Sequence, residues 1–203
     1  MSRKVFTHID THYDIADILK KSGICQNTPE YAELQGALTL IERHIRPRGV
    51  IRRCILDNRK GSLFLNGMPL RSGPLEALLR SLTGKRELVL GVLTAGEEID
   101  YIGTVTLEKV FNALKLATLT SALEYIAGFL KAEWDYKEVG WLNPGVLEEL
   151  PIQENRQLFR IVGNVFEDIG VDLSENCLMI PEFTVSAIFY EKKHPYDASA
   201  PEL

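Results

Sequence analysis

The stretch from about Thr104 to Trp134 constrains the fold more than any other part of this sequence. Its apolar residues recur three or four positions apart in two offset sets, which is the spacing of α-helical faces. The first set is Leu107, Val110 and Leu114, and the second is Leu116, Leu119, Leu123, Ile126 and Leu130. Because the two sets lie on different sides, we predict one long helix that is buried on more than one face.

Shorter helices and strands are predicted before this helix. Helical spacing and capping residues predict helices over 13–21, from Thr28 to His44, and from Ser72 to Gly84. β-leaning residues and turn signals predict a hairpin of 49–56 with 62–65, a turn at Asn66-Gly67 and a strand over 88–93.

Two further β-leaning runs, 171–179 and 184–190, lie near the carboxyl end on either side of Ile180-Pro181-Glu182-Phe183. We predict that they pair as a terminal antiparallel hairpin.

Helices mixed with antiparallel hairpins, without a regular β-α-β alternation, indicate an α+β fold. The predicted organisation is N-terminal helices and a hairpin over 1–85, a core of the same compact unit over 86–191, and a loose tail over 192–203.

Composition narrows the classes of partner. With 203 residues, 45% of them hydrophobic, the chain can bury a sizeable core. A net charge of −5 leaves no basic excess to neutralise a phosphate backbone, so we expect no nucleic-acid partner. Charged residues interrupt every apolar run before it reaches the roughly 18 residues of a membrane span. No apolar signal core follows Met1, so we expect a cytoplasmic protein without a membrane partner.

The recognisable catalytic and cofactor motifs are missing. Neither the Gly-x-Gly-x-x-Gly fingerprint nor the phosphate-binding Gly-x-x-x-x-Gly-Lys-Ser/Thr loop occurs, nor a Gly-x-Ser-x-Gly elbow. The segment from His8 to Asp14 alternates nitrogen and oxygen ligands that suit a divalent metal, and it equally suits capping residues before a helix. Glu97 and Glu98 fit either acid-base chemistry or the first turn of a helix. We assign no catalytic residue and no metal ligand.

Three blocks between Leu88 and Tyr190 match one known pattern in order. They are Thr94–Glu98 with Ser121–Glu124, then Asn143–Gly145 with Leu150–Phe159, and last Gly170–Ile188. The last block is similar to a Gly-x-x-Leu-Thr-Glu-Ser-x-x-Met-x-Pro-x-x-Ser-Val-Ser hairpin, and the second to a Pro-Gly-Tyr loop and the helix after it. The chain therefore resembles the activation (reactivation) domain of cobalamin-dependent methionine synthase, in a free-standing form.

The resemblance implies a fold like that domain and a loop that binds S-adenosylmethionine in the family. The residues implied around such a ligand are Glu124, Trp141, Asn143, Pro144, Gly145, Val146 and Glu175. Gly145 would let the backbone approach a ligand closely, Glu124 would attract a cationic group, and Trp141 would offer an aromatic face. A plain surface turn, a solvated helix residue and core filling are the respective alternatives.

Two departures from the pattern fall in this loop. The family has an Arg three residues before the Pro, where this chain has Trp141, and its Tyr is replaced by Val146. Neither side chain can replace a guanidinium or a phenol, so the sequence leaves open whether S-adenosylmethionine is bound or lost. No corrinoid module accompanies the match, so cobalamin would be reached only through a partner protein.

These observations leave three functional hypotheses. In the first, the protein docks in trans on a corrinoid protein or cobalamin-dependent methyltransferase and supports its reductive reactivation or methylation. In the second, it is a non-catalytic binding or scaffolding relative that has lost S-adenosylmethionine. In the third, it is an independent enzyme in which Glu98, Glu124 and Glu175 converge in an acidic pocket. The sequence determines neither turnover nor the oligomeric state.

Overall fold

The computed structural model describes residues 2–42, 44–59, 62–70, 72–82, 87–97 and 108–192. The strands are β1 (Arg3–Phe6), β2 (Arg48–Arg59), β3 (Ser62–Leu65), β4 (Met68–Pro69), β5 (Glu87–Thr94), β6 (Val139–Leu142), β7 (Asp172–Leu173), β8 (Met179–Ile180) and β9 (Thr184–Glu191). The helices are α1 (Ile15–Lys21), α2 (Pro29–Glu42), α3 (Gly73–Leu82), α4 (Glu108–Trp134), α5 (Asn155–Val162) and α6 (Val165–Ile169), with a 3-10 turn η2 (Ile152–Glu154) before α5. The predicted start of the long helix at Thr104, and the predicted tail beyond Lys192, lie outside the described residues.

The main sheet is antiparallel throughout and has the order β4-β3-β2-β5-β9-β6, with β1 also paired to β2. One edge of the long strand β2 pairs with β5, and its other edge is shared by β1 and β3. The predicted hairpin of β2 with β3 is confirmed, with Leu56 opposite Leu65. Asn66 and Gly67 form the predicted turn between β3 and β4 with φ of 52° and 78°, because such tight hairpins need positive φ at both central residues.

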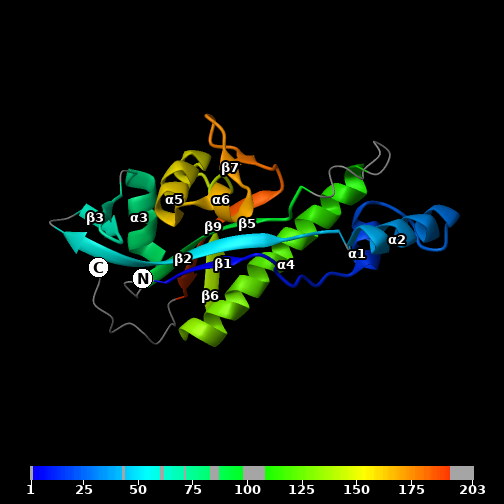
Figure 1. Ribbon diagram of the computed structural model, residues 1–203, viewed down its shortest axis with the longest axis horizontal. Helices are drawn as coiled ribbons and strands as arrows, with labels where there is room; N and C mark the ends of the chain where they lie inside the picture. Colours follow the sequence, from blue (N-terminus) through cyan, green and yellow to red (C-terminus); the bar gives the residue numbers. More distant parts are fainter. Residues whose placement is uncertain are drawn as a thin grey trace.

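Two hydrophobic clusters cover the two sides of this sheet, because successive strand residues point to opposite sides. Leu90 and Ile188 belong to the cluster that packs against α3, α5 and α6, and we call this side the α5 face. Their neighbours Val89 and Phe189 belong to the cluster that packs against the second half of α4, and we call this side the α4 face. Figure 1 shows α5 and α6 on one side of the sheet and α4 crossing the other.

Helix α4 confirms the predicted long, buried helix. Its first half contributes Val110 and Leu114 to a third cluster, shared with α1 and α2, and its second half contributes Ile126 and Leu130 to the α4 face. The two offset apolar sets therefore contribute to two different cores, except that Leu116 of the second set is 62% exposed and Leu107 lies outside the described residues. By length and composition alone α4 would pass as a membrane span, but 56% of its most apolar window is buried within the protein, as in a core helix.

Two helices begin where the sequence predicts their caps. The Thr28 hydroxyl accepts a hydrogen bond from Tyr31 N (3.1 Å) before α2, and the Ser72 hydroxyl accepts one from Leu75 N (3.2 Å) before α3. Each bond satisfies an amide that the helix itself leaves without a partner, and such a cap is worth about 1 kcal/mol.

The predicted terminal hairpin is wrong in its pairing. Cys177 has a φ of 64°, and Ser174 N donates to Leu178 O (2.8 Å), so the run 171–179 turns back on itself and forms the short β7-β8 ribbon. Strand β9 pairs with β5 and β6 instead. The reason is tertiary: a strand in the middle of a buried sheet must satisfy its amides and carbonyls on both edges, and only β5 and β6 supply both partners.

Candidate functional site

The Pro-Gly loop directly follows β6 and is attached to β9. The Asn143 side chain donates from Nδ2 to Ser186 O (2.8 Å). Within the loop, Gly145 N donates to Leu150 O (2.7 Å), and Val146 N donates to Asn143 O (3.2 Å). Gly145 has a φ of 88°, a conformation that favours glycine. The loop is therefore a compact turn whose position depends on the first residues of β9.

A second polar connection lies on the α5 face beneath this loop. Asn155, the first residue of α5, is fully buried. It accepts from Ser186 Oγ at Oδ1 (2.6 Å) and donates from Nδ2 to Cys177 O (3.1 Å). One side chain thus links α5 to β9 and to the β7-β8 ribbon, and it satisfies two buried polar groups that have no access to water.

The end of β5 meets the same region. Ala95 N donates to Phe183 O (3.0 Å), and the Thr94 hydroxyl donates to the same oxygen (3.4 Å). The Thr94 hydroxyl in turn accepts from Gly96 N (3.1 Å), and Lys115 Nζ lies 4.6 Å from the centre of the Phe183 ring. Residues of all three blocks therefore meet around Phe183 and Ser186, whereas the Ser121–Glu124 part of the first block belongs to α4, where Ser121 accepts from His12 N.

The structure keeps three of the predicted site residues together and exposes a fourth. Pro144 is buried and Asn143 is half-buried beneath the turn, while Gly145 is exposed. Val146 follows them with 75% of its surface exposed. The side that faces solvent therefore begins with glycine backbone and the Val146 side chain, and continues with the exposed residues Leu147, Glu148 and Glu149.

Trp141 points away from this loop face. Its ring packs on Phe189 with centroids 6.4 Å apart and belongs to the α4 face. The next residue, Leu142, packs on the α5 face. Because neighbouring strand residues alternate, the sheet separates the Trp141 ring from the Asn155 and Ser186 bonds.

The two predicted carboxylates lie on opposite sides of the sheet. Glu124 is exposed on α4, whereas Glu175 is exposed in the turn between β7 and β8, where its carbonyl accepts from the Arg156 guanidinium of α5. Glu98, the third member of the hypothetical acidic pocket, lies outside the described residues. Because Glu124 and Glu175 lie on the surface on opposite sides of the sheet, they do not form the acidic pocket that the third hypothesis requires.

The described residues of the loop do not match the polar groups that S-adenosylmethionine finds in the family. A half-buried indole on the α4 face stands in place of the guanidinium at Trp141, and an exposed isopropyl group stands in place of the phenol at Val146. The amides of Gly145 and Val146 already donate within the turn. We therefore assign no reaction step to S-adenosylmethionine.

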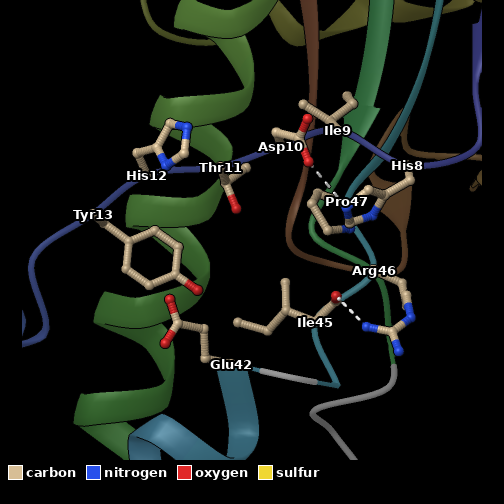
Figure 2. Close-up of a pocket in the computed structure, with 10 residues that line it drawn as sticks. All are labelled: His8, Ile9, Asp10, Thr11, His12, Tyr13, Glu42, Ile45, Arg46 and Pro47. Carbon is tan, nitrogen blue, oxygen red and sulfur yellow. Dashed lines mark hydrogen bonds and ion pairs between the residues drawn. The ribbon is translucent and has the colours of Figure 1, made fainter.

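Residues 8–13 of the His8 to Asp14 segment line a separate hollow, shown in Figure 2. His8 Nε2 lies 3.4 Å from Asp10 Oδ1, and the Asp14 carboxylate caps α1 by accepting from Ala16 N (2.8 Å). Among the residues that the structure describes, no group of three or more His, Cys, Asp or Glu side chains is arranged to hold a metal. Capping and an exposed His-Asp pair account for these residues.

Sequence reasoning missed Asn155 and Ser186, which hold the site together. Both belong to the matched blocks, but neither was chosen as a site residue. The available signal was a polar residue in an apolar context: Ser186 stands between Val185 and Ala187 in a run that otherwise suits a buried strand.

No family model matches this sequence, and no curated protein sequence matches it. Among solved structures, the fold is similar to that in the crystal structure of the MetH reactivation domain bound to AdoHcy. The alignment covers 95% of this chain and 82% of that chain, with 14% sequence identity and a TM-score of 0.47. At this identity the likeness concerns the path of the backbone alone.

Proposed function

We propose that this protein is an accessory protein of a cobalamin-dependent methyltransferase system, which docks on a corrinoid protein in trans and supports its reductive reactivation or methylation. The observation that supports this proposal is the convergence of the three resembling blocks. Asn143 and Asn155 connect the second block to the third, and Phe183 connects the third block to Thr94 of the first. A resemblance spread over unrelated segments would give no such hydrogen-bonded unit.

Exposed apolar side chains on this unit suit a protein partner. Val146 and Leu147 on the loop are 75% and 37% exposed, and Leu178 and Ile180 around β8 are 55% and 57% exposed. Asn143 attaches the loop to β9, and Asn155 attaches the segment around Cys177 to α5. Large apolar side chains on a rigid surface are typical of protein interfaces, so we place the partner contact here.

The alternative is a binding or scaffolding relative that has kept docking and lost S-adenosylmethionine. Trp141 and Val146 favour this version, because neither supplies a polar group to the loop. In both versions the protein acts in the cytoplasm beside its partner.

The docking experiment mixes the full chain with a corrinoid protein of the source organism in its cob(II)alamin state. We expect coelution on a sizing column, and faster return of the methylcobalamin spectrum once reductant and a methyl donor are added. Leu178→Ser with Ile180→Ser should weaken the complex at least about tenfold, or about 1.4 kcal/mol. The control is Leu116→Ser, at a side chain that is 62% exposed on α4. Failure of the wild-type chain to coelute would refute the docking role.

Calorimetry with S-adenosylmethionine and S-adenosylhomocysteine distinguishes the two versions. Saturable micromolar binding would rule out the version that has lost the ligand. Complex formation without any such binding would support it.

A further inference from the structure

An open hollow of about 210 Å³ lies where the segment 8–13 passes the link from Glu42 to Pro47 (Figure 2). Ile9 N donates to Pro47 O (2.9 Å), which joins the two walls, and His12 N donates to Ser121 Oγ of α4 (2.7 Å). Within the link, residue 43 lies outside the described residues. These two hydrogen bonds hold the segment 8–13 against the link and against α4.

The floor of the hollow is apolar and lies at the junction of two cores. Ile9 is 0% exposed and belongs to the α4 face, whereas Ile45 is 3% exposed and belongs to the cluster of α1, α2 and α4. Pro47 adds a third apolar side chain to the lining. An alkyl stem of a ligand would lose water against this floor.

The polar groups are divided between two ends of the hollow. At one end Glu42 lies near Tyr13, and burial followed by the Glu42 charge raises the pKa of Tyr13 to about 12, against a smaller lowering by the Thr118 hydroxyl. Tyr13 is therefore uncharged at neutral pH. The ion pairs formed between described residues do not include Glu42.

The other end carries charges of both signs. His8 pairs with Asp10, and the Arg46 guanidinium donates to Ile45 O (3.0 Å) and makes further contacts. With histidine counted as neutral, Asp10 and Glu42 against Arg46 give the lining a net charge of −1, and the Glu42 carboxylate lies beside the Tyr13 side chain (Figure 2). A carboxylate together with an aromatic face is the pairing that attracts organic cations.

We propose that this hollow binds a small primary alkylammonium ion, with the ammonium against the Glu42 carboxylate and the Tyr13 ring and the alkyl stem on Ile45 and Pro47. An ammonium has three donors and no acceptor, which suits the Glu42 carboxylate and the hydroxyl of Thr11 on the wall. The volume is below the roughly 300–1,000 Å³ of sites for drug-sized ligands, so a ligand of a few heavy atoms fits.

The probe for this proposal is n-butylamine, titrated into the isotopically labelled full chain and followed by amide NMR shifts. We expect saturable shifts confined to 8–13 and 44–47, with a Kd of about 1 mM. Glu42→Gln, which keeps the shape and removes the charge, should weaken binding at least about tenfold, and Tyr13→Leu should also weaken it. Glu33→Gln on the exposed surface of the same helix is the matched control and should bind as the wild type does.

Two further ligands test separately whether binding needs the positive charge and whether it needs the alkyl stem. n-Butyrate, with the same stem and the opposite charge, and ammonium chloride, without a stem, should give no saturable shifts. Equal affinity of Glu42→Gln and wild type, equal binding of butyrate, or shifts that do not saturate or lie elsewhere would each overturn the proposal. The outcome is independent of the corrinoid role, because neither a partner protein nor S-adenosylmethionine is present.

Discussion

Replacing Asn155 by Ala tests whether one buried side chain holds the converging blocks together. The substitution removes both hydrogen bonds and leaves the Ser186 hydroxyl and the Cys177 carbonyl without their partner. A buried polar group without a partner costs about 1–3 kcal/mol, so two of them predict a loss of about 2–6 kcal/mol in the free energy of unfolding. That is a large part of the roughly 5–15 kcal/mol that stabilises a typical domain.

The assay is urea unfolding followed by circular dichroism, with Gln153→Ala as the control. Gln153 is exposed on the turn before Asn155, so its loss should change the free energy of unfolding by less than about 0.5 kcal/mol. Ser186→Ala alone should cost about 1–2 kcal/mol, because it leaves only the Asn155 acceptor unsatisfied. The double variant should be less destabilised than the sum of the singles by about 1 kcal/mol, since both remove the same bond.

Two results would refute this reasoning. One is an Asn155→Ala protein as stable as the Gln153→Ala control. The other is strict additivity with Ser186→Ala, which would mean that the two side chains do not interact. In the docking assay, Asn155→Ala should also weaken the complex, because the segment that carries Leu178 and Ile180 would lose its hydrogen bond to α5.

The remaining predictions concern stability at high pH, a close backbone approach and the exposed loop residue. Burial raises the pKa of the Cys54 thiol from 9.0 to about 12, so between these pH values only the unfolded state releases the thiol proton. The free energy of unfolding should therefore fall by about 1.4 kcal/mol per pH unit above pH 9. In urea unfolding measured at several pH values, Cys54→Ala should make this fall less steep. Gly49→Ala should destabilise the protein by about 1–3 kcal/mol, because the new Cβ would collide with the buried Leu93 side chain. Gly128→Ala, which has open space around it in α4, should stabilise the protein by up to about 1 kcal/mol. Equal unfolding midpoints for the two variants would contradict the packing argument. Val146→Tyr should leave the unfolding midpoint within about 0.5 kcal/mol of wild type, because the side chain is 75% exposed; a larger loss would mean that the loop packs more tightly than this.

Local sequence signals account well for the individual elements. Thr28 and Ser72 mark the helix starts, and Asn66-Gly67 marks a turn, because each side chain acts on backbone groups a few positions away. The long helix can be predicted equally well from the sequence, since its two offset apolar sets indicate burial on more than one face. The α+β class follows from these elements together.

The class of fold, the long helix and the blocks that resemble one family can all be inferred from the amino-acid sequence. The pairing of β9 with β5 and β6, the position of Trp141 on the opposite side of the sheet from the Asn155 bonds, and the separation of Glu124 from Glu175 are visible only in the folded chain. Caps, turns and periodicity can be inferred because they depend on neighbours in the chain. Strand partners and the two sides of a sheet depend on residues that are brought close only by burying both faces of the whole sheet at once.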